Sequence, residues 1–540
     1  MPNNFNLVDE PWLPVVWGDG TAREVGLRDA LVRAHEIREL VDGSPLVTVS
    51  LHRLLLAILH RNFGPKSFED WKDLWRGARW DADVLDRYFA EWRHRFDLFD
   101  AARPFYQSMT LKDGTKVHPP ALLAMERSAG NNPTIFDHSF AASRSLMSPA
   151  EAARQLVARQ AYSLGGGVSD PFNFSQATLT AGFSVLALGD TLFQTLALNL
   201  TQYGSEHPIL PTERDQPIWE QDDPHVPTKN GHDDKEGTRP RGPIDHLTWQ
   251  SRRIKLLTQD DPLRVIGVQL SQNLKPHAET YDPFKSFAMS KEQGWVARRL
   301  DPDRAVWRDS HAIFQQTSES GRRPVLFNWL GRVFRANRSK EIQAAAAYPL
   351  SILGLGREAT AKAADVSIWR HERFTVPLAY LEDTTLLGDL REMLELAEDV
   401  GRLLGRGTTT IQTDGKTVNV PRPFQLLAQT LLAVGENRAD PKRVEAAIDH
   451  LAPQQRYWAG LEVPFRALLR DLAGDAPDAA REAWAIALQR AAWEAFREAT
   501  SGLDRTARAL EAVARAEHEL RRRLYGLLHD HLPAREGVTA

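Results

Sequence analysis

The sequence of 540 residues contains no cysteine, no long apolar run and no large excess of charge of either sign. The absence of cysteine excludes disulfides, thiol catalysis and cysteine-ligated zinc or iron–sulfur sites. It also fits a reducing compartment, so we expect a cytoplasmic protein. The most apolar long segment, 178–200, is interrupted by Asp190, Thr191 and Gln194, so we predict no membrane span.

The small net charge restricts how the protein could bind nucleic acid. Acidic residues exceed basic ones by enough to give a formal net charge of −4. A protein that coats nucleic acid on its own is usually basic, so any such binding here must be local or shared with basic partners. The length is too great for one hydrophobic core, and we therefore expect at least two domains.

The first two thirds of the chain mix strand and helix patterns, which predicts a large α/β globular domain over residues 1–379. Residues 13–17 have a strand pattern, whereas 47–63 and 325–347 have helical spacing of apolar residues. Residues 221–242 lose the apolar period and carry charge and turn residues, which predicts a mobile loop.

The remainder, residues 380–540, predicts a four-helix bundle, so the fold class expected for the whole chain is α+β. Apolar residues recur at spacings of three and four in four segments. The first spans 386–404, and the second starts at Asp440 and extends to Leu472 with a kink at Pro464. Residues 405–423 between them are interpreted as an inserted loop.

Two polar loops joined by one short helix form the most distinctive stretch of the chain. The first loop is 130–139, and the helix after it has Ser148 as N-cap and Pro149 at its first position. The helix ends at the glycine triplet 165–167. Three glycines allow a close approach of backbone N–H groups to a phosphate, sugar or base edge, but they also suit a helix C-cap followed by a turn. The pairing of the two loops favours a recognition surface.

No catalytic motif is present. The sequence has no phosphate loop, no H-E-x-x-H and no G-x-S-x-G. The best metal-like groups are His371-Glu372 and His529-Asp530-His531, whereas zinc needs three or four converging ligands. We therefore expect no enzymatic activity, no metal and no cofactor. The alternative is a nucleic-acid hydrolase that uses His371 and Glu372.

Several segments, taken in order along nearly the whole chain, resemble the CasA family, the large subunits of the type I-E CRISPR surveillance complex Cascade. The segments that carry this resemblance are 6–15, 96–107, 134–138, 165–167, 247–249 and the C-terminal bundle.

The resemblance implies a non-catalytic, DNA-binding subunit of an RNA-guided complex in antiviral defence. Members of this family recognise the protospacer-adjacent motif (PAM) of double-stranded DNA, largely from the minor groove, through a glycine loop, a lysine finger and a glutamine wedge. The wedge starts strand separation, and the subunit helps to recruit the CRISPR helicase-nuclease. The partners implied are the other Cascade protein subunits, the CRISPR guide RNA and the target DNA. Protein recognises the flanking motif, and base pairing recognises the rest.

Family positions can be assigned to residues of this sequence. The glycine loop corresponds to Gly165, Gly166 and Gly167. The lysine finger corresponds to Lys275, with Ser271 to Asn273 as the alternative.

The wedge corresponds to Thr360, Ala361 and Lys362, where the glutamine of the family is absent. The loop that anchors the subunit beside the guide RNA corresponds to the following residues: Ile135, Phe136, Asp137 and His138.

Overall fold

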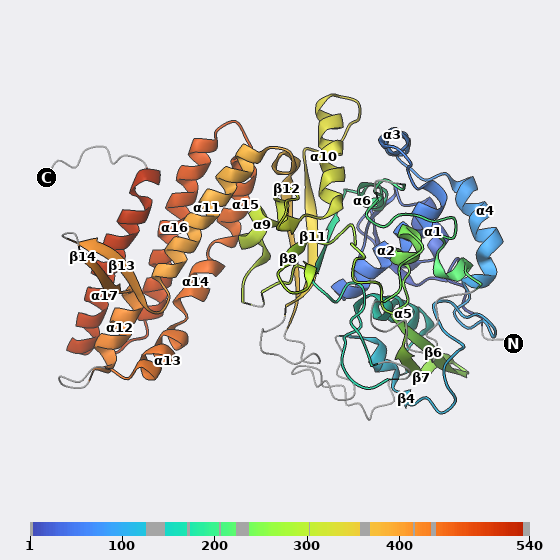
Figure 1. Ribbon diagram of the computed structural model, residues 1–540, viewed down its shortest axis with the longest axis horizontal. Helices are drawn as coiled ribbons and strands as arrows, with labels where there is room; N and C mark the ends of the chain where they lie inside the picture. Colours follow the sequence, from blue (N-terminus) through green and yellow to red (C-terminus); the bar gives the residue numbers. More distant parts are fainter. Residues whose placement is uncertain are drawn as a thin grey trace. The chain divides into compact units, whose positions relative to one another are not determined.

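Two compact units make up the chain, residues 1–381 and 382–540. The computed structural model (Figure 1) describes residues 4–125, 146–169, 173–204, 207–222, 237–301, 303–356, 368–413, 416–433 and 439–532. The expected boundary after residue 379 lies two residues from this division.

The first unit starts with a small antiparallel sheet in the strand order β2-β1-β3. Its strands are β1 (Leu13–Trp17), β2 (Ala22–Val25) and β3 (Ile37–Leu40), so the strand predicted at 13–17 is confirmed. Helix α1 (Leu27–Val32) follows β2.

Helix α2 (Pro45–Phe63) is the centre of this unit. Its start is fixed by Ser44, whose side chain accepts a hydrogen bond from the Val47 N–H, and by Pro45 in the first turn. Fifteen of its 19 residues are buried, which places it among other elements rather than on the surface. It packs against α5 (Pro149–Tyr162) and α8 (Pro243–Leu247).

A buried ionic cluster fastens α2 and α8 to the segment that precedes β8. The Asp282 carboxylate forms an ion pair with Arg53 at 2.9 Å and a hydrogen bond with His246 Nε2 at 3.0 Å, and all three side chains are buried. Burial by itself would raise the pKa of Asp282, but the Arg53 guanidinium and the hydrogen bond from His246 hold that pKa well below its usual value. Asp282 therefore stays ionised, whereas burial lowers the pKa of His246, which contributes a hydrogen bond to the cluster.

Three further three-stranded sheets complete the first unit. Their orders are β4-β7-β6, β12-β11-β5 and β10-β8-β9. The strands are β4 (Val117–His118), β5 (Phe183–Ala187), β6 (Arg252–Asp260), β7 (Leu263–Gln272), β8 (Phe287–Ser290), β9 (Gly294–Ala297), β10 (Gly321–Arg322), β11 (Ala347–Gly356) and β12 (Ile368–Pro377). The remaining helices and 3-10 turns are α3 (Phe68–Gly77), α4 (Ala82–Trp92), η1 (Arg93–Arg95), η2 (Pro120–Leu123), α6 (Leu192–Asn199), η3 (Ile218–Glu220), η4 (Val306–Asp309), α9 (Ser310–Phe314), α10 (Val325–Arg338) and η5 (Leu378–Leu381).

The helix predicted over 325–347 is too long. Helix α10 ends at Arg338, and Lys340 adopts a positive φ of 62°, which stops helical continuation. The apolar residues that follow belong to strand β11, which pairs antiparallel with both β5 and β12. An apolar run of this kind suits a buried strand as well as a helix, and the backbone break at Lys340 decides between them.

The second unit is mainly helical (orange to red in Figure 1), but its helices are more numerous than predicted. Its elements are α11 (Thr384–Leu403), β13 (Thr408–Thr413), β14 (Lys416–Pro421), α12 (Pro423–Leu432), α13 (Pro441–Leu451), α14 (Pro453–Ala459), α15 (Glu462–Asp471), α16 (Pro477–Thr500), α17 (Ala507–Leu528) and η6 (His529–His531). The long helices α11, α16 and α17 pack on one another, with α12 against α17 and with α14 and α15 against α16.

Two local predictions for this unit need correction. The second predicted helix is divided into α13, α14 and α15, because Ala452 adopts a left-handed φ of 47° before Pro453. Pro464 lies in the first turn of α15, where proline is tolerated, so it does not kink a longer helix. The inserted loop 405–423 contains the antiparallel hairpin β13–β14, whose strands are rich in threonine and valine.

We expect residues 382–532 to fold alone, because this segment has its own core. Circular dichroism should show a helical spectrum and a single cooperative thermal transition. In this fragment Trp484→Ala should reduce the free energy of unfolding by about 3 kcal/mol, since the Trp484 ring is buried and its Nε1 donates to Met393 O at 2.8 Å. Val463→Ala is the matched control, because Val463 is 76% exposed. A broad transition without cooperativity would contradict the independence of this unit.

Candidate functional site

The glycine triplet lies in the connection that follows α5. Gly166 and Gly167 have φ values of 100° and 90°, a region in which L side chains are strained. The Gly166 N–H donates to Phe174 O at 2.8 Å, and the Phe174 N–H donates to Gly167 O at 3.2 Å. Within residues 164–169 and 173–176, we call Gly166 to Val168 the glycine-loop tip and the residues on either side of it the stems. The tip, Gly166 to Val168, is exposed, and Val168 is 90% exposed.

Gly165 differs from its two neighbours because it is buried. A Cβ at this position would lie 3.0 Å from the Gln176 backbone nitrogen, so the two stems approach more closely than a side chain allows. Gly165 therefore permits packing of the stems, whereas Gly166 and Gly167 present backbone to solvent. The helix cap is Ser163 rather than a glycine of the triplet, and the close approach of the Gly166 and Gly167 backbone to a ligand stays a prediction.

The Arg252 guanidinium, at the start of β6, holds both stems. Its Nη2 donates to Leu164 O at 2.6 Å and to Ser175 O at 2.7 Å, and its Nη1 donates to Gln272 Oε1 at 2.8 Å. The side chain is 1% exposed, and its carbon Cζ lies 4.9 Å from the centre of the Phe174 ring. Burial lowers the pKa of Arg252 to about 9, so the group remains charged at neutral pH.

Strand β7 adds a second set of contacts to the same loop. Gln272 donates from its backbone N–H to Ser169 Oγ at 2.8 Å, and its Oε1 accepts from the Ser175 N–H at 2.9 Å. The hydroxyls of Ser169 and Ser271 lie 3.0 Å apart. The exposed tip is thus held by hydrogen bonds to strands β6 and β7 of the three-stranded sheet, which limits the conformations that it can sample.

These contacts bear on the position of the predicted lysine finger. Ser271 and Gln272 belong to β7, and Ser271 to Asn273 are all buried. Lys275 lies beyond the end of the strand and is half-buried, with its carbonyl accepting from the Thr238 N–H at 2.9 Å. Of the two alternatives, only the Lys275 side chain has a charge and access to solvent.

Other predicted site residues lie outside the described residues. They are Ile135, Phe136, Asp137 and His138 of the anchoring loop and Thr360, Ala361 and Lys362 of the wedge. Most of the predicted mobile loop, 223–236, also lies outside them. The wedge segment lies between β11 and β12 in the sequence, so the described residues give only the strands on either side of it.

The residues of the alternative hydrolase serve structural roles. The Glu372 carboxylate accepts from the Val306 N–H at 2.9 Å, and His371 Nε2 lies 2.9 Å from Ser351 Oγ. Across the described ranges, no group of three or more histidine, aspartate or glutamate side chains is placed to hold a metal ion. None of the helices in those ranges combines the length and hydropathy that a membrane crossing needs.

Fold and site together define a two-unit α+β protein with a rigidly mounted, backbone-exposing glycine loop. The profile of the CRISPR-associated protein Cse1 family matches residues 6–495. The chain is 31% identical over 532 residues to the CRISPR-associated protein CasA/Cse1 of Thermus thermophilus, covering 96% of this chain and 97% of that protein. The chain therefore belongs to the Cse1 (CasA) family.

Solved structures share this fold. The crystal structure of Thermobifida fusca Cse1 has a TM-score of 0.79 at 25% identity and covers 98% of this chain and 99% of that chain. A chain of a structure described as a CRISPR RNA-guided surveillance complex has a TM-score of 0.71 at 22% identity, with 96% of this chain and all of that chain (100%) covered. The family resemblance inferred from the sequence is confirmed.

We expect Arg252→Met to destabilise the first unit and loosen the glycine loop. The substitution leaves the carbonyls of Leu164 and Ser175 and the Gln272 amide oxygen without their buried donor, at a cost of about 3 kcal/mol in the free energy of unfolding. Urea unfolding measures the loss, and limited proteolysis should show new cleavage near residues 164–176.

Arg338→Met is the control for this substitution, because Arg338 is exposed at the end of α10. The assigned role of Arg252 would be wrong if both variants unfolded at the same urea concentration as the parent protein.

Proposed function

We propose that this protein is the large subunit of a CRISPR RNA-guided surveillance complex, and that it recognises the PAM of double-stranded target DNA without catalysing a reaction. The observation that carries the proposal is the glycine-loop tip, which combines exposed backbone with a rigid support from Arg252 and Gln272. Family membership supports the same function.

The chemistry of the tip suits the minor groove. Without a Cβ, Gly166 and Gly167 allow the main chain to approach base edges and sugars closely. The minor groove presents a degenerate pattern of acceptors and donors, so such a loop tolerates several related motifs. A loop that is already ordered loses less conformational entropy on binding than a flexible one.

The other proposed contacts follow from the family resemblance. Lys275 would serve as the lysine finger and neutralise phosphate charge. Thr360, Ala361 and Lys362 would form the wedge that starts strand separation, with a smaller side chain at the glutamine position. Residues 135–138 would anchor the subunit beside the guide RNA.

The partners proposed are the other protein subunits of the complex, the CRISPR guide RNA, the target duplex and the helicase-nuclease that degrades it. A net charge of −4 is consistent with this arrangement, because neighbouring subunits would supply most of the phosphate neutralisation. The duplex recognition proposed here is confined to one loop of the protein, which recognises a short motif. Pairing with the guide RNA recognises the remainder of the target.

We expect Gly166→Asp to weaken binding of target duplex by the assembled complex at least tenfold, or about 1.4 kcal/mol, while assembly is unchanged. A carboxylate would repel phosphate, and a Cβ would strain the positive φ of 100°. Val168→Asp separates these causes, because it adds the charge where Val168 has no positive φ and is 90% exposed. Gel-shift titration gives the affinities, and co-purification of subunits and RNA reports assembly.

Gly20→Asp is the matched control for both substitutions, since Gly20 also has a positive φ, 86°, and open space around it, but lies in the β1–β2 turn. Equal affinity of the Gly166→Asp, Gly20→Asp and parent complexes for the duplex would exclude the glycine loop from target recognition.

A further inference from the structure

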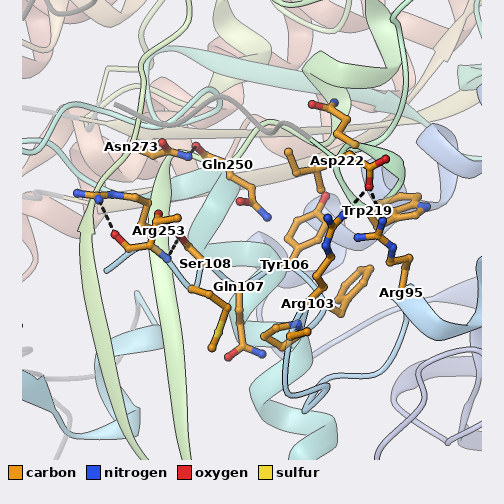
Figure 2. A pocket seen from close by; sticks show the side chains of 17 residues that line it. Arg95, Arg103, Tyr106, Gln107, Ser108, Trp219, Asp222, Gln250, Arg253 and Asn273 are labelled. Atoms are coloured by element: carbon orange, nitrogen blue, oxygen red, sulfur yellow. Dashed lines mark hydrogen bonds and ion pairs between the residues drawn. The ribbon is translucent and has the colours of Figure 1, made fainter. Parts of the chain in front are cut away.

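A cavity of about 260 Å³ lies beside strands β6 and β7 (Figure 2) and takes no part in the glycine loop. Its wall is formed by the 102–110 segment together with residues from four other places in the first unit: Arg95, Ile218, Trp219, Gln221, Asp222, Gln250, Arg253 and Asn273. The volume is at the small end of ligand pockets, which limits an occupant to about one aromatic ring system with its substituents.

Two guanidinium groups converge at one side of this cavity. Arg95 Nη2 lies 2.8 Å from Asp222 Oδ1, and Arg103 Nη1 lies 2.5 Å from the same oxygen. The Arg95 side chain is only 12% exposed, whereas the Asp222 side chain is 78% exposed. Arg95 is therefore built into the wall, whereas the Arg103 side chain is 48% exposed. The carboxylate that pairs with both cations lies at the surface, where a stronger anion can replace it.

The rest of the cavity is suited to a planar ring. Tyr106 packs on Phe105 with ring centres 4.7 Å apart, and Trp219 lies 6.1 Å from Tyr106, so these residues give the cavity an aromatic wall. Tyr106 adopts a positive φ of 58°, a backbone conformation that is unusual for a bulky residue and is found preferentially at ligand sites.

Carboxamide groups line the side opposite the arginines. Asn273 is 7% exposed, and its Nδ2 donates to Gln250 O at 2.9 Å. Its Oδ1 accepts no hydrogen bond from the described residues and is closed off from solvent, so Asn273 orders this side of the wall and the Gln250 carboxamide is the amide that faces the cavity. Figure 2 shows the Gln250 side chain extending into the cavity between Asn273 and Tyr106.

We propose that this cavity binds one nucleotide unit, with its phosphate on Arg95 and Arg103 and its base between the aromatic wall and the Gln250 carboxamide. A phosphate monoester carries more charge than a carboxylate and offers three acceptor oxygens, so it can engage both guanidinium groups and displace Asp222. A base offers a flat face to the rings and hydrogen-bonding donors and acceptors to the Gln250 carboxamide. Neither free phosphate nor an uncharged nucleoside uses both halves of the cavity.

The nucleotide unit could be a free nucleoside monophosphate or the 5′-phosphorylated terminal residue of a single strand, both of which carry a phosphate monoester. Isothermal titration of the full chain with inorganic phosphate, adenosine, AMP and a 5′-phosphorylated tetranucleotide distinguishes these sources. We expect AMP to bind at least tenfold more tightly than phosphate or adenosine. A further tenfold gain for the tetranucleotide identifies a single strand as the source, and equal affinity identifies the free nucleotide.

Two substitutions at the same ion pair should act in opposite directions. Asp222→Asn removes the competing carboxylate and keeps both arginines, so AMP affinity should rise about threefold or more. Arg103→Gln removes one of the two cations and should reduce AMP affinity at least tenfold. Asp86→Asn is the control, since it breaks the comparable Arg28–Asp86 pair elsewhere on the unit and should leave AMP affinity unchanged.

Opposite effects cannot arise from a general loss of folding, and they do not depend on the function proposed for the glycine loop. Gly166→Asp should leave AMP binding unaltered. The proposal is overturned if AMP gives no binding heat with the parent chain and the Asp222→Asn variant, if adenosine and AMP bind equally, or if Arg103→Gln binds AMP as well as the parent chain does.

Discussion

One buried guanidinium, that of Arg252, holds the most unusual backbone of this protein in place. A connection containing three glycines would otherwise sample many conformations, because glycine loses more backbone freedom on ordering than any other residue. The Arg252 guanidinium donates hydrogen bonds to the Leu164 and Ser175 carbonyls, and Gln272 on the neighbouring strand accepts one from the Ser175 N–H. These hydrogen bonds restrict the stems on both sides of the exposed tip, and such preorganisation would lower the entropy cost of the recognition proposed for it.

Strands β6 and β7 contribute to both the glycine loop and the cavity. Arg252 and Gln272 are register partners and contact the glycine loop, whereas Arg253 and Asn273 line the cavity. Ser271, the register partner of Arg253, links the two because its hydroxyl contacts both Ser169 and Arg253. Both surfaces belong to the first unit, as does the α2 core beneath them. The long helices of the second unit bury their apolar seams against one another.

The sequence predicted most clearly the elements that begin at capping residues and proline. Ser148 and Pro149 marked the start of α5, whereas its end at Tyr162, with Ser163 as C-cap, comes before the glycine triplet that was expected to end it. The sequence could not show that Gly165 serves packing while Gly166 contacts solvent, because this depends on Gln176 meeting Gly165 across the loop. Arg252 was missed for the same reason: a buried arginine looks like any other until its carbonyl partners are known. In the second unit, repeated apolar spacing indicated helices but not the break at Ala452.

The central claim is that the mounted glycine-loop tip contacts target DNA, and the absence of native cysteine allows a direct measurement. A single Val168→Cys substitution, carrying a short photoactivatable crosslinker, places the probe at a position that is 90% exposed. Val463→Cys, which is 76% exposed on α15, is the matched control. In the assembled complex we predict crosslinks from residue 168 to the duplex that flanks the RNA-paired segment, and none from residue 463. Equal crosslinking from both positions, or none from residue 168, would contradict the account.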